Sequence, residues 1–277
     1  MVSAARSLPA VSIAAFEGNI LSYEEAKQWA RETNPDVILH LAAVVPTEKV
    51  SREPALARRV NSMGPARFAE AVMAGCTGPA PHFVFTSTSH VYQSSEEPID
   101  ETGLVSPQNI YGETKLAGEQ NLAKIQDENQ RFRLLIARVF SVFSEDQAES
   151  FLLRSLQRKL AAAAPSRVLH IPGWDHTRDF LHASQAARLL LDLAMAKSSG
   201  VVNVGSGSGK TILDFASHYF QTNIEVKGPP KSQNPSSLVA NIRLLRETLG
   251  HSRVEEILGE AHYCVSQKPQ HHKGKDL

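Results

Sequence analysis

The sequence of 277 residues predicts an α/β fold with a doubly wound parallel sheet. Short, wholly apolar runs such as VILHLA and FVF alternate with longer amphipathic stretches. Parallel strands that helices cover on both faces have this continuous apolar character. Turn signals such as Asn34 followed by Pro35 separate the runs, and the alternation of strand and helix is that of crossover units.

The alternation of apolar and amphipathic runs assigns each predicted strand and helix to a residue range. Strands are expected at 11–16, 36–42, 82–87, 132–140, 168–171 and 201–205. Helices are expected at 22–33, 54–76, 111–129 and 149–164, then after 180, from 211, and around 240–250 and 253–261. The rhythm loosens after Ser141, which predicts a smaller C-terminal lobe for the substrate.

The predicted division of the chain follows from this change of rhythm. Residues 1–140, completed by about 175–205, form the part that contains the sheet, and residues 141–174 and 206–265 form the lobe. Within the lobe, 227–237 has the composition of a loop, and 266–277 is expected to be a disordered tail.

Composition excludes several classes of partner. Lys plus Arg and Asp plus Glu each number 29, so the net charge gives no electrostatic reason to bind nucleic acid or a membrane surface. The 2 cysteines are too few for a disulfide framework, which predicts a cytoplasmic protein. No apolar run is long enough to span a membrane, and no metal site is predicted.

The stretch VGSGSGKT, residues 204–211, has the look of a phosphate-binding loop but not its spacing. Such a loop needs four residues between its first Gly and the Gly-Lys pair, so that backbone N–H groups wrap a phosphate. Gly205 and Gly209 enclose only three. The dinucleotide pattern G-x-G-x-x-G also fails, because it requires Gly where Lys210 stands. We interpret the stretch as a turn that leads into a helix at Thr211, with Lys210 as a solvated charge.

The stretch YGETK offers acid–base chemistry. Tyr111 and Lys115 are four residues apart, so a helix places them on one face. Free tyrosine has a pKa of about 10, and a nearby ammonium group lowers it. Such a tyrosine exchanges a proton with a sugar hydroxyl or carbonyl, which is typically worth ~10²–10⁴ in rate. Taken alone, the spacing favours an ordinary exposed helical pair over a catalytic one.

Two neighbouring strands end in residues that suit a ligand. Hydroxyl side chains at 86–89 follow one strand, at the edge where ligands gather in doubly wound sheets. The preceding strand ends in the small residues Ala42 and Ala43, which let a flat ligand approach the backbone. The alternatives are an ordinary strand end and ordinary tight packing.

In combination, these motifs resemble the extended short-chain dehydrogenase/reductase family, which comprises sugar-nucleotide epimerases, dehydratases and reductases. The resemblance covers about 11–250 and is most similar to the GDP-6-deoxy-4-keto-mannose reductase branch. It implies a Rossmann-type sheet, NAD or NADP as cofactor, a nucleotide-sugar substrate and a homodimer.

The resemblance also implies roles for residues in FEGNI, HLAA, RRVNSMG, FTSTSHVY, YGETK, RVFSVFSEDQ and RDF. The catalytic residues are Thr88, Tyr111 and Lys115. The cofactor-binding residues are Asn19, Ile20, Leu41, Ala42, Ala43, Asn61, Ser87, Tyr111, Lys115 and Phe140. The substrate-binding residues are Thr88, Ser141 and Arg178, of which Arg178 meets the nucleotide diphosphate.

Some positions depart from the family pattern. Asn is usual where Ser141 stands, and Gly is usual where Gln93 and Ser144 stand. Dehydratases carry an acidic pair where this chain has Ser89 and His90, which argues against a 4,6-dehydratase. His90 either contacts a sugar or is a loop histidine without such a role.

The largest departure concerns the cofactor's pyrophosphate. The family opens with a strand and G-x-x-G-x-x-G, whose glycines let the pyrophosphate reach a helix N-terminus. Here the only Gly before Gly64 is Gly18. We therefore expect an N-terminally incomplete sheet, impaired binding of the dinucleotide, and a strand with a glycine loop encoded upstream if the start is misassigned. Two hypotheses remain open: a nicotinamide-dependent reductase or epimerase, and a truncated or regulatory member without catalysis.

Overall fold

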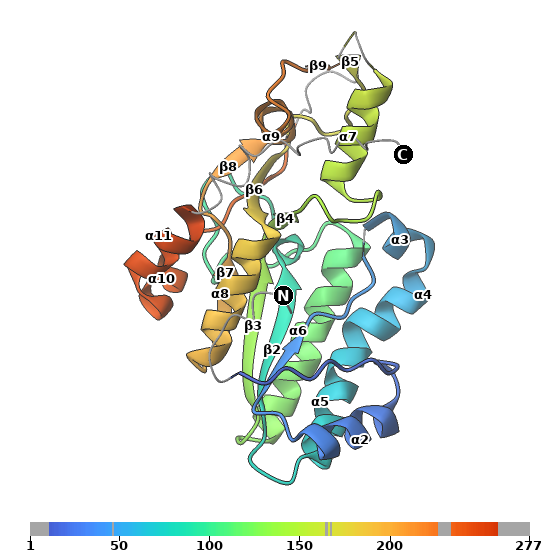
Figure 1. The fold of residues 1–277 in the computed structure, drawn as a ribbon, viewed down its shortest axis with the longest axis vertical. Coiled ribbons are helices and arrows are strands. Elements are labelled where there is room, and N and C mark those ends of the chain that lie inside the picture. Colours follow the sequence, from blue (N-terminus) through green and yellow to red (C-terminus); the bar gives the residue numbers. More distant parts are fainter. Residues whose placement is uncertain (1–10, 46, 164–165, 167, 227–233, 260–277) are drawn as a thin grey trace, which may run out of the picture.

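A parallel sheet is the centre of the molecule. The structure is a computed structural model, and it describes residues 11–45, 47–163, 166, 168–226 and 234–259. The sheet has the order β1-β2-β3-β7, and all neighbours are parallel. Its strands are β1 (Val37–His40), β2 (His82–Thr88), β3 (Arg133–Val139) and β7 (Gly200–Val204), all visible in Figure 1. The α/β class and the parallel sheet are thus confirmed.

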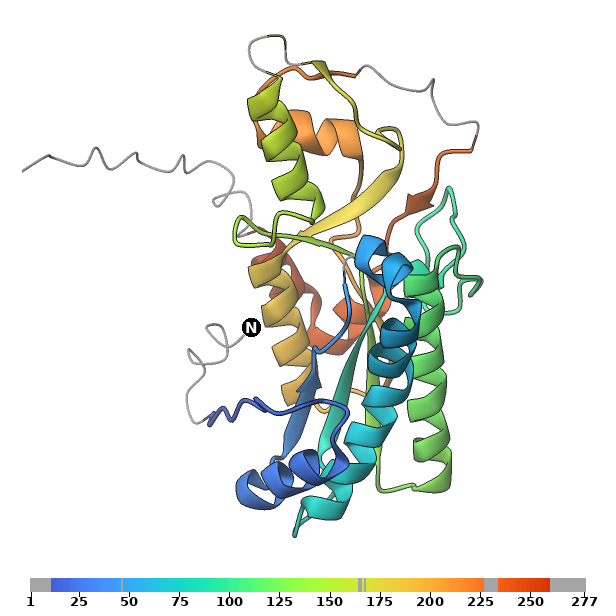
Figure 2. The same ribbon diagram turned by 90° about the vertical axis from the view of Figure 1, so that its right-hand side faces the viewer.

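Helices cover both faces of this sheet (Figure 2). On β2, Phe83 and Phe85 point to one core, whereas Val84 between them points to another. This alternation is the two-residue period of a strand, and it explains why the strands are apolar throughout. The helices of the first core are α2 (Tyr23–Thr33), α5 (Gly64–Gly75) and α6 (Ile110–Glu128). Those of the second are α8 (Ala183–Met195), α10 (Arg243–Leu249) and α11 (His251–Gly259).

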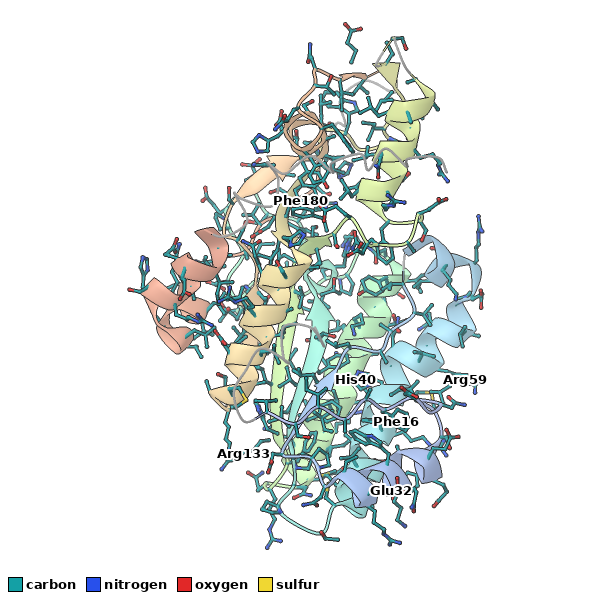
Figure 3. All side chains as sticks on the ribbon, in the orientation of Figure 1. Phe16, Glu32, His40, Arg59, Arg133 and Phe180 are labelled. Carbon is teal, nitrogen blue, oxygen red and sulfur yellow. The ribbon has the colours of Figure 1, made fainter. Side chains whose placement is uncertain are left out.

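A smaller group of elements lies at the top of Figure 1, beyond the sheet. Its strands are β4 (Ser141–Phe143), β6 (Thr177–His182), β8 (Gly209–Thr211) and β10 (Ser237–Leu238), in one sheet, and the pair β5 (Val168–Leu169) and β9 (Glu225–Val226). The helices α7 (Leu152–Ala162) and α9 (Ile212–Tyr219) pack there around a separate small core. Phe180 of β6, labelled in Figure 3, stacks on Phe215 with ring centroids 3.9 Å apart. The domain boundaries stay predictions.

The N-terminal stretch differs from its prediction. Residues 11–16 form no strand in the described part of the chain, and 12–15 are exposed. Phe16 alone finds an apolar environment, with ring centroids 5.7 Å from Trp29 and 5.1 Å from Phe68 (Figure 3). The predicted strand is wrong here because an apolar run becomes a strand only where a neighbouring strand accepts its hydrogen bonds.

The helix predicted at 54–76 is interrupted. Within this range the observed elements are α4 (Pro54–Ala57), the π-helical turn η1 (Arg58–Met63) and α5. A further short helix, α3 (Thr47–Arg52), precedes them. A π-turn often marks a functional position within a helix. The predicted tail at 266–277 and most of the predicted loop at 227–237 lie outside the described residues. Within the described chain, no helix has the length and apolar character needed to cross a membrane.

Candidate active site

Thr88 and Tyr111 meet at the carboxyl edge of β2. Thr88 ends β2 and caps the short 3-10 helix η2 (Ser89–Val91). Asn109 begins α6, since its side chain accepts a hydrogen bond of 2.9 Å from the N–H of Gly112. Tyr111 therefore lies in the first turn of α6, where it forms a hydrogen bond with Thr88. The structure thus brings together Thr88 and Tyr111, two of the three residues that the sequence predicts as catalytic, and their roles stay predictions.

Two glycines let α6 lie close to its neighbours. A Cβ atom at Gly112 would be 2.2 Å from the carbonyl oxygen of His90, and one at Gly118 would be 2.5 Å from that of Asn61. Neither position accepts a side chain without a shift of backbone. The sequence contained the signal, because glycine inside a helix costs roughly 1 kcal/mol relative to alanine and therefore needs a packing reason.

Burial dominates the electrostatics of Tyr111 and Lys115. Burial raises the pKa of Tyr111 to about 12, although the hydrogen bond from Thr88 opposes this rise. Lys115 is 1% exposed, and its Nζ lies 4.1 Å from the centre of the Phe85 ring. Burial lowers the pKa of Lys115 to about 7, with Glu119 opposing. Burial thus decides the pKa of Tyr111, which is a neutral phenol in this structure, and the tuning of Tyr111 by Lys115 stays a prediction.

Asn61 fixes the chain that follows β1. Its side chain accepts a hydrogen bond of 2.7 Å from the N–H of Val44 and donates one of 3.2 Å to the carbonyl of the same residue. A further bond of 3.2 Å reaches Thr114 on α6. In this way Asn61 gives Val44 the bonds that a neighbouring strand would give. Just before it, Leu41 is 44% exposed, Ala42 is exposed and Ala43 is half-buried.

The side chains of four other predicted cofactor residues make hydrogen bonds or apolar contacts within the protein. The Asn19 side chain accepts a hydrogen bond of 3.0 Å from the N–H of Leu21, which closes the turn before α2. Ile20 packs against the core beneath α2, and Phe140 is buried in the opposite core. Ser87 donates a short hydrogen bond to Glu119. None of these four side chains contacts the Thr88–Tyr111 pair through an interaction seen among the described residues.

Arg178 of β6, a predicted substrate residue, already donates hydrogen bonds within the protein. Its Nη1 donates to the carbonyls of Thr177 and Ser236 at 2.7 and 2.9 Å, and its Nη2 donates to the Ser236 hydroxyl at 2.8 Å. These bonds leave fewer donors for a diphosphate than the sequence suggested. Ser141 opens β4 opposite Phe180.

His90 lies against Tyr111, which the sequence predicts as catalytic. Its ring meets the Tyr111 ring edge-on at 5.9 Å, and its Nδ1 is 3.0 Å from the Asn109 side-chain nitrogen. Burial, and then the charge of Arg178, lower its pKa to about 4, so the imidazole is neutral. The structure thus places His90 at the site, where the sequence left two interpretations open.

The glycine turn surrounds a carboxylate of its own chain. Asp179 is buried and accepts hydrogen bonds from the N–H groups of Ser206, Gly207 and Ala240 at 2.7, 2.9 and 3.2 Å. The Ser206 hydroxyl adds a bond of 2.6 Å. Lys210 is exposed on β8, and Thr211 caps α9. The turn that the sequence predicts is found between β7 and α9, but its last residues form the short strand β8, which was not predicted. The N–H groups of Ser206 and Gly207 already have an acceptor in Asp179.

The carboxyl edge suits the nicotinamide and ribose half of a dinucleotide. Leu41 offers exposed apolar surface next to the small residues Ala42 and Ala43, and Tyr111 and Lys115 offer polar groups. The pyrophosphate half has no glycine-rich loop among the described residues ahead of β1. No group of residues suited to hold a metal ion occurs in the described chain.

Sequence comparisons identify a family and several related proteins. The model of the NAD dependent epimerase/dehydratase family matches residues 3–205. The chain is 28% identical over 207 residues to GDP-6-deoxy-D-mannose reductase of Pseudomonas aeruginosa, which covers 71% of this chain and 67% of that protein. It is 26% identical over 290 residues to UDP-glucose 4-epimerase of Streptococcus mutans, with 94% and 86% covered. A match to dTDP-4-dehydrorhamnose reductase of Salmonella typhimurium is 34% identical but covers only 39% and 35%.

Solved structures show the same fold. The structure of RMD from Pseudomonas aeruginosa, complexed with NADPH, has a TM-score of 0.76 at 23% identity and covers 94% of both chains. The UDP-glucose 4-epimerase of Thermus thermophilus, complexed with NAD, has a TM-score of 0.68 at 21% identity, with 89% of this chain and 85% of that one covered.

Proposed function

Because the chain belongs to the NAD dependent epimerase/dehydratase family, we propose that it is an NAD(P)-dependent reductase that acts on the 4-keto group of a nucleotide-activated sugar. An epimerase is the alternative within the same family. The observation that carries the proposal is the meeting of Thr88 and Tyr111 at the carboxyl edge of β2, with Lys115 one turn further along α6. A homodimer that pairs through helices such as α6 belongs to the same proposal.

Each catalytic residue has a distinct part in this reaction. Tyr111 gives its proton to the 4-keto oxygen, and Thr88 orients the phenol through their shared hydrogen bond. The ammonium form of Lys115 stabilises the phenolate that remains. A bound nicotinamide would supply the hydride. Arg178 keeps the nucleotide diphosphate near β6, and Ser141 lines the sugar site.

The protonation state of Tyr111 favours reduction over oxidation of the sugar. A phenol with a pKa of about 12 holds its proton throughout the neutral range. It therefore starts as an acid, which is what carbonyl reduction requires. Oxidation of a hydroxyl, the first step of a 4-epimerase, requires the phenolate instead. The name of the Pseudomonas relative, GDP-6-deoxy-D-mannose reductase, points to the same direction of reaction.

A non-catalytic family member is the second candidate. Two observations favour it. Arg178 donates its hydrogen bonds to Ser236, and the described residues ahead of β1 contain no glycine-rich loop. Such a protein would keep the fold and the buried polar residues but not the tight cofactor site.

A titration and an assay separate these candidates. If the chain is a reductase, NADH or NADPH fluorescence changes on weak binding to the 277-residue chain, and GDP- or dTDP-activated 4-keto-6-deoxysugars oxidise the bound cofactor. If binding occurs and only the corresponding 4-hydroxy sugars react, the epimerase is correct. If neither dinucleotide binds at millimolar concentration, the non-catalytic candidate is correct.

A further inference from the structure

The first turn of α6 fixes the orientation of one amide side chain. Asn109 is the N-cap of α6, and its side-chain oxygen accepts a hydrogen bond of 2.9 Å from the N–H of Gly112. The first N–H groups of a helix have no partner within the helix, so the cap supplies one. If the amide were turned over, its nitrogen would face that N–H, and two donors would meet. The nitrogen of the Asn109 side chain therefore faces away from α6.

This nitrogen meets the ring of His90. The distance from Nδ2 of Asn109 to Nδ1 of His90 is 3.0 Å, which is the length of a hydrogen bond. An amide nitrogen only donates, so Nδ1 of His90 is the acceptor and carries no proton. A neutral imidazole has one ring proton, which then lies on Nε2. Asn109 thus determines which nitrogen of His90 carries the proton.

Further contacts hold His90 beside the predicted catalytic residues. Its backbone N–H donates a hydrogen bond of 3.3 Å to the hydroxyl of Thr88. Its ring meets the Tyr111 ring edge-on, with the two centres 5.9 Å apart. Arg178 is close enough for its charge to lower the pKa of His90. The imidazole therefore lies next to the Thr88–Tyr111 pair and near the residue proposed for the diphosphate.

The Nε2–H group of His90 is free to bind a ligand. His90 is half-buried, and within the described part of the chain its ring forms a hydrogen bond only through Nδ1. His40 differs, because both of its ring nitrogens are fully buried without a partner in the same residues. A donor that reaches the surface at a site gains a hydrogen bond when a ligand brings an acceptor.

We propose that Asn109 is a positioning residue, which keeps the His90 proton on Nε2, and that His90 donates this proton in a hydrogen bond to an oxygen of the sugar. The part that concerns the sugar rests on the proposed function. In a nucleotide sugar, the sugar separates the reacting carbon from the diphosphate, so its oxygens lie between Tyr111 and Arg178. A neutral N–H group suits a hydroxyl or ring oxygen there, and His90 selects substrates that carry such an acceptor.

Asn109→Asp reverses this contact with little change of shape. Aspartate is as good an N-cap as asparagine, so one carboxylate oxygen still accepts from Gly112. The other oxygen replaces Nδ2 and only accepts, so the proton of His90 should move to Nδ1. Asn241→Asp is the matched control, because the Asn241 oxygen accepts a bond of 3.0 Å from the N–H of Arg243 at the start of α10. Thermal unfolding shows that both variants are folded.

The main measurement is the position of the ring proton of His90, and it needs no activity. Nitrogen–proton correlation NMR of the full chain with isotope-labelled histidine, at mildly alkaline pH, shows which ring nitrogen is protonated, and His90→Phe assigns the signal. We expect the proton on Nε2 in the wild type and in Asn241→Asp, and on Nδ1 in Asn109→Asp. A proton on Nδ1 in the wild type, or none on Nδ1 in Asn109→Asp, overturns the inference.

The second measurement separates the sugar from the nucleotide. One neutral hydrogen bond is worth roughly 2–10-fold in affinity. Isothermal titration calorimetry should show this loss for a GDP- or dTDP-activated 4-keto-6-deoxysugar in Asn109→Asp and in His90→Phe, with the affinity for GDP or dTDP alone unchanged. Wild-type affinity for the sugar nucleotide in both variants, or an equal loss for the nucleotide alone, overturns the sugar contact. If the wild type binds no sugar nucleotide, the proposed function fails together with that contact, and the NMR result alone decides whether Asn109 positions His90.

Discussion

Two segments of this chain carry a lysine near glycine and threonine, and the two lysines differ in their burial. In YGETK, Lys115 is 1% exposed and lies beneath the catalytic edge. In GSGSGKT, Lys210 is exposed on β8. The difference comes from what surrounds each segment. The N–H groups of the second are taken by Asp179, whereas the hydroxyls of Thr88 and Tyr111 bond to each other at the carboxyl edge of the sheet.

The largest effect is expected for Tyr111→Phe, which tests the catalytic role proposed for the first segment. The variant loses only the proton donor, so turnover should fall by at least ~10², while binding of the sugar nucleotide changes little. Single-turnover kinetics with a 4-keto sugar nucleotide measure the effect. Tyr219→Phe is the control, because the Tyr219 hydroxyl bonds to Glu145 in the smaller lobe. Near-normal turnover of Tyr111→Phe would exclude the assigned proton donor.

Arg178→Ala tests the substrate side of the catalytic segment. A charged hydrogen bond is worth about 1.5–3 kcal/mol, so the affinity for a nucleotide diphosphate should fall roughly 10–100-fold. Isothermal titration calorimetry measures the affinity, and an unchanged far-UV spectrum shows that the fold is intact. Arg243→Ala, an exposed arginine of α10, is the control. Equal affinity in Arg178→Ala and wild type would move the diphosphate site elsewhere.

Asp179→Ala tests the glycine turn. The variant leaves the N–H groups of Ser206, Gly207 and Ala240 without their acceptor, and a buried donor without a partner costs about 1–3 kcal/mol. Urea unfolding should show a loss of at least that size, and Asp214→Ala, which removes a partner of Thr211 near the start of α9, a smaller one. Unchanged stability of Asp179→Ala would mean that the turn does not depend on its internal carboxylate.

The smallest expected effect is that of Lys210→Ala. Because Lys210 is a solvated charge, the variant should bind ATP, NADH and NADPH as the wild type does, and any turnover should be unchanged. Equilibrium dialysis with labelled ATP is sufficient. A large loss of ATP affinity in this variant alone would restore the interpretation as a phosphate-binding loop.

The sequence predicts the main sheet well for a physical reason. Strands β1, β2, β3 and β7 are buried on both faces, so their apolar runs are continuous and recognisable. The apolar run at 11–16 has the same composition, yet it forms no strand and only Phe16 packs against the core. An apolar sequence alone does not specify whether a neighbouring strand is present to form its hydrogen bonds.

The site was predictable to the extent that it depends on local spacing. The interval between Tyr111 and Lys115 predicts a shared helical face, and Thr88 follows from the end of a strand. The pKa of Tyr111 was not predictable in this way, because it depends on burial by distant segments. The same holds for the salt bridge between Glu119 and Arg138, which forms only because α6 packs against β3.

The two glycines of α6 matter to anyone who redesigns this protein. A Cβ at Gly112 would lie 2.2 Å from the carbonyl of His90 in η2, and one at Gly118 would lie 2.5 Å from that of Asn61 in η1, so the packing of α6 against these two turns leaves no space for a larger residue. Libraries that vary α6 will mostly lose folded members. Variants that test the proposed sugar site are better placed at Ser141, which lies at the start of β4 and outside α6.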